Sequence, residues 1–432
     1  MLAVFLAIVT LALCLAVIVA AYSWWPSALN PVLVGAIAWA PALVMLNFPP
    51  NFLSAVYIHL NMPISGLVFL AIAMAFVSFW LGCIIVRTLS PAGSFDHNEE
   101  RILSNFSPLT ALALYAVGFV VFVYSFTQSG LLSYTELDSA QIADARTALY
   151  LGWVNFVILL MDICSFALFA YAIKVRRLAW TLPFFVALIA YGATLQKTAI
   201  MWFVVGALTA AFLQPRAAFE LFWRPVAMRV TIILGASLVV AGLFFINDLR
   251  GISDFQLTAA SSPWFEQFYI YSGASAIMNL STSIDQYLPS TPQSFGQMLL
   301  RPLFWLLMDP DSLSVARYFE GVNTGTYLLY GWSDFRWLGF VVTPLVAGIL
   351  AMMYLRIAMR GSFVGLILAA IVLRAMVFSP STDILFDPTT TITIVIAAIT
   401  SFACRRTFRS GSTHAVSPYP NGPMMLRTGR GT

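Results

Sequence analysis

The chain has 432 residues, of which 60% are hydrophobic and only 9% are charged, with a net charge of +4. A soluble globular domain carries roughly 25% charged residues, so this composition excludes a water-soluble fold and predicts an all-α polytopic membrane protein. The 4 cysteines lie in or beside apolar runs without a CxxC pair, so neither a disulfide framework nor a metal site is expected.

Apolar stretches recur along the whole chain, and a bilayer core needs about 20 residues of helix. The first stretch has no basic n-region and is too long for a signal-peptide core, which indicates a retained span. The predicted spans are 2–22, 29–47, 64–86, 107–127, 148–173, 178–195, 198–213, 230–247, 337–355, 361–378 and 388–404. We expect about 11 spans, within about 10 to 12, in one membrane domain over 1–404. The tail 405–432 is rich in Pro, Gly and Ser and is expected to be disordered.

The apolar run 178–213 is interrupted by one lysine, Lys197. As a single helix it would measure about 54 Å, whereas the hydrocarbon core is about 30 Å thick. Helix tilt does not absorb that difference. We therefore predict a hairpin that turns at 196–198.

The Lys and Arg residues of the connections fall on one side of the predicted membrane topology. They are Arg87, Arg101, Lys174, Arg176, Arg177, Arg216, Arg224, Arg229, Arg356, Arg360, Arg405, Arg406 and Arg409. The positive-inside rule makes that side cytoplasmic. The C-terminus is then expected in the cytoplasm, and the N-terminus and Lys197 on the outer side.

The outer side carries one large periplasmic loop, 248–336, which is long enough to indicate a function. Two of its stretches, 264–281 and 298–308, are too apolar for a free loop, and we expect short amphipathic helices there. The carboxylates expected on this side could each supply a general base. They are Glu266, Asp285, Asp309, Asp311, Glu320, Asp334, Asp383 and Asp387.

Four cationic residues, Lys197, Arg250, Arg301 and Arg374, are expected near the outer face at membrane depth. Such groups are costly there and usually face a partner or a cavity, and arginine donors match a phosphate group well. Two alternatives stay open. Lys197 and Arg374 could snorkel to the interface, and Arg250 could form a local ion pair with a neighbouring aspartate.

The sequence contains no Walker loop, Rossmann glycine pattern, Ser-His-Asp set or metal-ligand cluster. This argues against ATP-driven transport and against chemistry on nucleotide sugars. The outer loop is rich in Tyr and Trp, which suit both sugar faces and the membrane interface.

The block FYIYSGASAIMNLSTSIDQY (268–287), followed by NTGTYLLYGWSDFRWLGFVVTPLVAG (323–348), resembles the oligosaccharide repeat-unit polymerases, the Wzy or O-antigen polymerase family. In that pattern Arg336 stands where Gly is usual after Asp334-Phe335. The segment GATLQKTAIMWFVVG resembles the family's Gly-Ser-Arg-Thr hairpin, with Lys197 at the Arg position. The resemblance covers roughly 190–350, and no Arg-x10-Gly motif of the kind some members carry is present.

The resemblance implies a membrane glycosyltransferase of the GT-C type, independent of metal, nucleotide and other cofactors. Its substrates would be undecaprenyl-diphosphate-linked oligosaccharides at the periplasmic face of the bacterial inner membrane. Its partners would be membrane lipids and a chain-length regulator protein, with no nucleic acid. The product would be a surface polysaccharide such as O-antigen, capsule or exopolysaccharide.

The candidate site residues fall into three groups. The catalytic candidates are Arg250, Glu266 and Asp334. The lipid-diphosphate candidates are Lys197, Arg301, Arg317, Arg336 and Arg374. The sugar-binding candidates are Tyr269, Tyr271, Asn279 and Tyr327. The alternatives are a lipid-linked oligosaccharide flippase or other transporter, and an O-antigen ligase, which would require a histidine that the loop 248–336 lacks.

Overall fold

The computed structural model of the chain describes residues 2–46, 64–91, 95, 103, 105–136, 139–149, 153–194, 197–214, 272–285, 296–304 and 326–405. The secondary structure of these residues is helical and contains no strand, which confirms the all-α prediction for the described part. An isolated β-bridge joins Phe106 to Arg405.

The apolar helices fall on every predicted span except 230–247, which lies outside the described residues. They are α1 (Leu2–Trp24), α2 (Pro31–Met45), α3 (Gly66–Leu89), α4 (Pro108–Gln128), α6 (Trp153–Val175), α7 (Leu182–Ala193), α8 (Lys197–Phe212), α15 (Gly339–Ala358), α16 (Phe363–Phe378) and α17 (Pro388–Ala403). By length and composition, 4 helical stretches could cross a membrane, and the others are shorter apolar helices. The architecture is compatible with a helical membrane protein, while the total number of spans and the GT-C type stay predictions.

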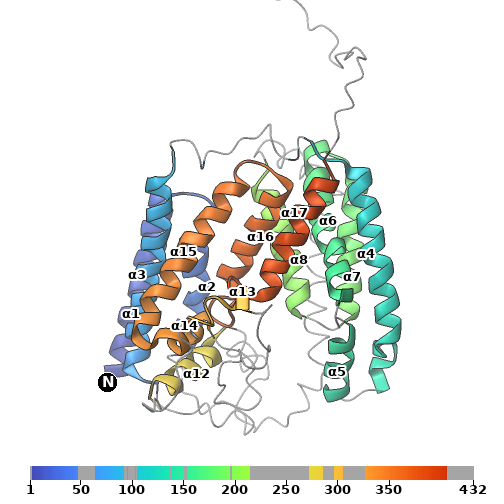
Figure 1. The fold of residues 1–432 in the computed structure, drawn as a ribbon. Helices are drawn as coiled ribbons and strands as arrows, with labels where there is room; N and C mark the ends of the chain where they lie inside the picture. Colours follow the sequence, from blue (N-terminus) through green and yellow to red (C-terminus); the bar gives the residue numbers. More distant parts are fainter. Residues whose placement is uncertain are drawn as a thin grey trace, which may run out of the picture.

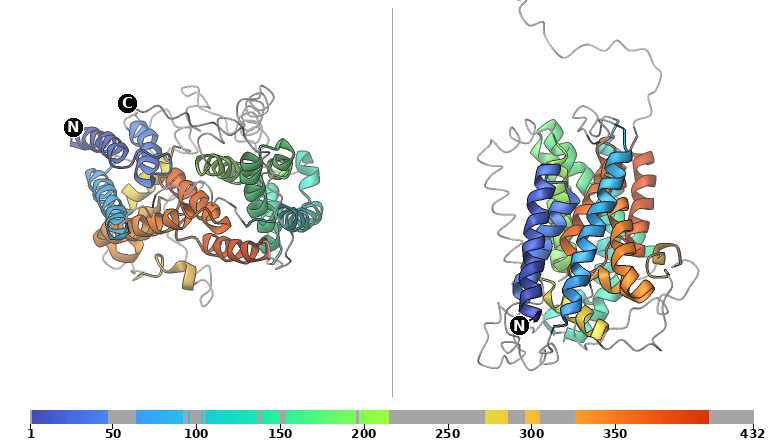
Figure 2. Two further views of the ribbon diagram at one scale, coloured as in Figure 1. Left: turned by 90° about the horizontal axis from the view of Figure 1, so that it is seen from above. Right: turned by 90° about the vertical axis from the view of Figure 1, so that its left-hand side faces the viewer.

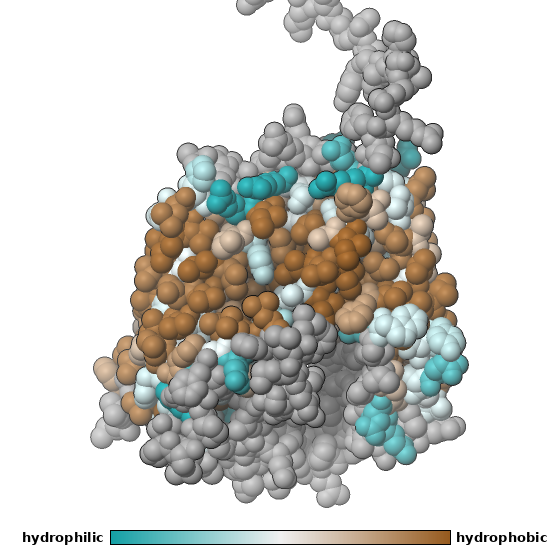
Figure 3. Space-filling model, in the orientation of Figure 1, coloured by the Kyte–Doolittle hydropathy of each residue, from teal (hydrophilic) through white to brown (hydrophobic). Residues whose placement is uncertain are grey.

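The helices form two groups that α16 and α17 connect (Figures 1 and 2). In one group α1, α2, α3 and α15 pack together, and in the other α4, α6, α7 and α8 do. Helix α16 contacts α2 and α15 on one side and α6 and α8 on the other, while α17 packs against α16 and α6. A broad apolar belt covers the face seen in Figure 3, as expected for a surface in contact with lipid.

Small residues allow the closest helix pair, α3 and α15, to approach backbone to backbone. A Cβ added to Gly82 would clash with the carbonyl oxygen of Leu345, and a Cβ on Gly348 would clash with that of Phe79. Helix association in lipid depends on such close packing, because there is no hydrophobic drive between apolar helices.

The run 178–213 is two helices, as its length predicts. The aromatic rings of Phe184 in α7 and Phe203 in α8 lie 5.4 Å apart. In one continuous helix these residues would be about 28 Å apart, so the chain must reverse between them. Helix α7 ends at Ala193, and Lys197, which lies within the predicted turn 196–198, is the first residue of α8.

The shorter helices gather at the end of the bundle where the marked N-terminus lies, called here the lower end as in Figure 1. They are α5 (Ser139–Leu149), α12 (Ala274–Asp285), α13 (Arg301–Phe304) and α14 (Tyr327–Phe335). Helices α12 and α13 overlap the two apolar stretches predicted to be helical in the loop 248–336. Every residue of α12 from Ala274 to Ile284 is buried, so this helix packs inside the protein rather than lying on its surface.

Three 3-10 turns complete the described elements: Leu131–Glu136, Leu178–Thr181 and Arg336–Leu338. The last of these joins α14 to α15 and begins at Arg336, whose φ of 54° is one that glycine adopts more easily. This is the position where the Asp-Phe-Gly pattern would place a glycine.

Candidate functional site

The connection between α16 and α17, residues 379–387, is recessed from the lower end of the bundle. Both helices have 16 residues, whereas α3 has 24. At about 1.5 Å per residue, α16 and α17 are therefore about 12 Å shorter than α3. Figure 1 shows that their lower ends stop above the lower end of α3. The polar residues of the connection are thus held inside the helix bundle.

Local hydrogen bonds fix both ends of this connection. The indole Nε1 of Trp39 in α2 donates to Ser379 Oγ at 2.8 Å, and Thr326 Oγ1 donates to the Ser379 carbonyl at 3.1 Å. At the other end Asp387 is the N-cap of α17 and accepts from the Thr389 amide at 2.8 Å. An Asp-Pro pair is a typical helix start, because the side chain caps an amide and the proline needs no partner.

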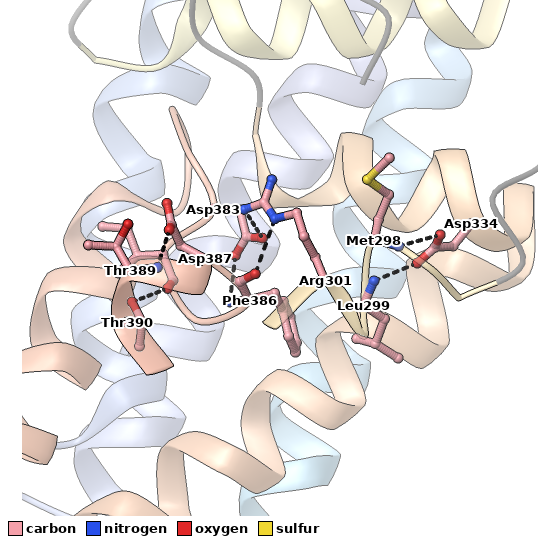
Figure 4. Close-up of polar contacts among 10 residues, drawn as sticks. Met298, Leu299, Arg301, Asp334, Asp383, Phe386, Asp387, Thr389 and Thr390 are labelled. Atoms are coloured by element: carbon pink, nitrogen blue, oxygen red, sulfur yellow. Dashed lines mark hydrogen bonds and ion pairs between the residues drawn. The ribbon is translucent and has the colours of Figure 1, made fainter. Parts of the chain in front are cut away.

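A buried ion pair lies at the centre of the connection (Figure 4). Nη2 of Arg301 is 3.8 Å from Oδ2 of Asp383, and Arg301 Nε donates to the Phe386 carbonyl at 3.3 Å. The guanidinium also lies over the ring of Tyr330, 4.9 Å from its centroid. Asp383 is only 4% exposed, and its Oδ1 accepts from the Phe386 amide at 3.2 Å.

Burial raises the pKa of Asp383 to about 7, although the positive charge of Arg301 opposes the rise. A carboxyl group with a pKa near neutrality exchanges a proton readily at physiological pH. This is the property that a general base requires.

Asp334 holds the turn that carries Arg301. Its Oδ1 accepts from the Met298 amide at 3.0 Å and its Oδ2 from the Leu299 amide at 2.7 Å, as Figure 4 shows. Both carboxylate oxygens are therefore engaged in a side chain that is 1% exposed. This geometry suits a positioning role better than the direct catalytic role expected from the sequence.

An apolar pocket opens beside Asp383. Its walls come from α2, α3, α15 and α16, and its polar groups include Trp39, Tyr327, Ser379 and Asp383. Tyr327, expected to bind sugar, packs edge-on against Trp39 and interacts electrostatically with Asp383. The pocket thus combines apolar walls with the carboxyl group of Asp383.

A second cluster of charge lies on the other side of α16. Arg374 lies over the indole of Trp202 in α8, 5.0 Å from the ring centroid, and interacts electrostatically with Asp162 and Asp387. Asp162, from the middle of α6, interacts with Tyr191 and Trp202, while its Oδ1 is buried without a hydrogen-bond partner. Because Asp387 also interacts with Arg301 and Asp383, the two clusters are continuous.

Asp162 is a site residue that the sequence analysis missed. It is 4% exposed and interrupts the apolar sequence WVNFVILLMDICSFALF. An ionisable residue within a membrane span is itself a signal of function, and that signal was present in the sequence.

The other predicted residues are distributed as follows. Lys197 begins α8 at the lower end, and Arg336 lies over the ring of Trp332, 5.5 Å from its centroid. Asn279 is buried in α12. Arg250, Glu266, Tyr269, Tyr271 and Arg317 lie outside the described residues. The structure therefore brings together Arg301, Arg374 and Tyr327, with Asp334 behind them.

No family model matches this chain, and neither a curated protein nor a solved structure matches it.

Proposed function

We propose that this chain joins undecaprenyl-diphosphate-linked oligosaccharide repeat units into a surface polysaccharide at the periplasmic face of the bacterial inner membrane. One observation carries the proposal. A buried carboxyl group, Asp383, lines an apolar pocket and pairs with Arg301. Such a site places a group that exchanges a proton beside an apolar surface for part of a substrate.

In the proposed reaction, a hydroxyl oxygen of the acceptor repeat unit attacks the anomeric carbon of the donor sugar. A new C–O bond forms while the bond from that carbon to the diphosphate breaks, and undecaprenyl diphosphate leaves with the electron pair. Asp383 takes the hydroxyl proton, because its raised pKa suits a base near neutral pH.

Arg374 is the residue whose N–H groups are proposed to bind the diphosphate, in the bound substrate as well as while the leaving group departs, and Arg301 holds Asp383 in place. The donor carries its own leaving group, so the reaction needs no nucleotide.

Charge distribution supports the orientation proposed for the membrane. Basic residues gather at the upper end, where α1, α3, α6 and α15 end, and Figure 3 shows hydrophilic residues along that rim. They include Arg87, Lys174, Arg177, Arg356 and Arg360. The positive-inside rule favours a cytoplasmic upper end and a periplasmic site.

A lipid-linked oligosaccharide flippase is the second candidate, and Asp162 is the observation that favours it. A buried carboxylate in the middle of a span is typical of a proton relay in transporters. An O-antigen ligase is disfavoured, because the loop 248–336 has no histidine.

Glycan analysis of a deletion strain that carries variant genes tests the proposal. Asp383→Asn should abolish long glycan chains while single-repeat products still reach the surface, Arg250→Ala should do the same, and Arg301→Gln should shorten the chains. Arg177→Gln, at the opposite end, is the control and should leave the ladder intact. Loss of the single-repeat products would favour the flippase, and a normal ladder at normal protein levels would refute the role of Asp383.

A further inference from the structure

Arg374 is a partly buried arginine whose hydrogen-bonding capacity is not used. Its Nε is buried without a hydrogen-bond partner, and among the described residues no carboxylate lies within the 4.0 Å of an ion pair. Arg301 differs, because its Nε and Nη2 are directed at Phe386 and Asp383. A buried donor without a partner is rare in folded proteins and requires an explanation.

The surroundings of Arg374 hold the guanidinium in place without occupying its donors. The indole of Trp202 lies against it, 5.0 Å from the ring centroid to Cζ, and the charges of Asp162 and Asp387 attract it from two sides. A cation held over an aromatic face keeps its edge free for a ligand.

Asp162 is the centre of this arrangement, since it connects several helices to Arg374. Tyr191 in α7 and Trp202 in α8 both interact with its carboxylate, and Tyr115 in α4 interacts with it electrostatically. The same Trp202 lies against the guanidinium of Arg374. Asp162 therefore orients both the ring and the charge.

We propose that Asp162 is a positioning residue that, together with Trp202, aims the free donors of Arg374 at the diphosphate of the lipid-linked substrate. This inference rests on the proposed function. Asp162 touches no substrate atom itself, and it acts by fixing the guanidinium in a low-dielectric site where a diphosphate is bound strongly.

The competing explanation is that Asp162 only neutralises a buried arginine. A double variant separates the two, because replacing both partners of a buried pair often restores stability. Asp162→Asn/Arg374→Gln should unfold at nearly the wild-type temperature and yet bind substrate weakly. Full activity in this double variant would mean that the pair is structural and would overturn the proposal.

The kinetic test uses the purified full-length protein in lipid vesicles with a lipid-linked repeat unit. Asp162→Asn should raise KM by about tenfold and leave kcat within about twofold, since it loosens a charge-assisted contact made to the substrate. Tyr191→Phe removes one polar group that interacts with Asp162 and should raise KM less. Thr209→Ala, a buried hydroxyl of α8 that bonds only within its own helix, is the control and should leave KM unchanged.

If Asp162→Asn does not fold, the same comparison of KM with kcat in Tyr191→Phe and Trp202→Phe decides the question. An unchanged KM in the folded variants overturns the proposal.

Binding of inorganic pyrophosphate distinguishes this inference from the proposed function. The probe should raise the unfolding temperature of the wild-type protein, and the rise should vanish in Arg374→Gln and shrink in Asp162→Asn. A wild-type protein that shows this rise without polymerising refutes the function and leaves the anion site standing. A rise that is equal in all three proteins refutes the inference.

Discussion

Asp383 is the residue on which the proposed chemistry depends. Its carboxyl group is buried in the wall of an apolar pocket, and among the described residues it forms an ion pair with Arg301. Burial disfavours the ionised form and the arginine favours it. The balance between the two leaves the pKa of Asp383 at about 7, so both protonation states are populated near neutral pH.

The first prediction is a pH dependence of glycan transfer. Because the base must be ionised, and burial raises its pKa to about 7, the rate should rise between about pH 6 and 8 and then level off. Arg301→Gln removes the positive charge that opposes the rise in the pKa of Asp383. The limb, which is the rising part of the pH–rate curve, should therefore move to higher pH by about one unit or more. Arg301→Lys keeps the charge and should shift it less. A limb that stays in place in Arg301→Gln would exclude Asp383 as the titrating group.

The second prediction concerns Asp334, which accepts two backbone amides from the turn before Arg301. In Asp334→Asn one side-chain oxygen still accepts a backbone amide, but the side-chain NH2 group faces the other backbone N–H and cannot accept from it. This should destabilise the protein by about 1–3 kcal/mol. The turn that holds Arg301 should loosen, so the pH limb should shift in the same direction as in Arg301→Gln. Ser333→Ala is the neighbouring control.

The stability and the pH–rate curves of Asp334→Asn and of its control Ser333→Ala decide what Asp334 does. Loss of transfer with unchanged stability and an unchanged limb would restore the direct catalytic role that the sequence suggests for Asp334.

The packing of α3 against α15 depends on glycines, which have no side chain at the contact. The backbone of Phe79 occupies the place of a Cβ on Gly348, so Gly348→Ala must push the helices apart. We expect a loss of about 1–3 kcal/mol in stability, measured by thermal unfolding in detergent. Gly192→Ala in α7 meets nothing within 4 Å and should be neutral or slightly stabilising. Equal effects of the two substitutions would contradict the close packing of α3 on α15.

Helix length was the most informative sequence signal at this scale. It predicted the break near Lys197, since no bilayer accommodates the run 178–213 as one span. Composition was less informative for α12, because a helix with five buried polar side chains (Ser275, Asn279, Ser281, Thr282 and Ser283) does not differ in pattern from one at a membrane surface.

For the molecule as a whole, hydropathy predicted the helices, and the pairing of charges followed only from the fold. Helices α14, α15 and α16 separate Arg301 from Asp383 in the chain, so no local pattern joins them. Asp162 and Arg374 meet only because α6, α8 and α16 pack together. Isolated charged residues within apolar runs indicate candidate site residues in the sequence. The sequence does not indicate which of them pair.

The whole molecule places α16 and α17 between two helix groups, with both acid–arginine clusters at their shared lower end (Figures 1 and 2). A movement of one group relative to the other would therefore change the geometry of the candidate site. This arrangement is what makes a polymerase and a flippase the two functions to separate.

The most direct test of the central proposal is a reconstitution of the purified protein with a lipid-linked repeat unit as the only substrate. The wild-type protein should form polymer and release one undecaprenyl diphosphate for each new glycosidic bond, and Asp383→Asn should do neither. Polymer formation by Asp383→Asn at the wild-type rate, or none by a folded wild-type protein, would contradict the proposal.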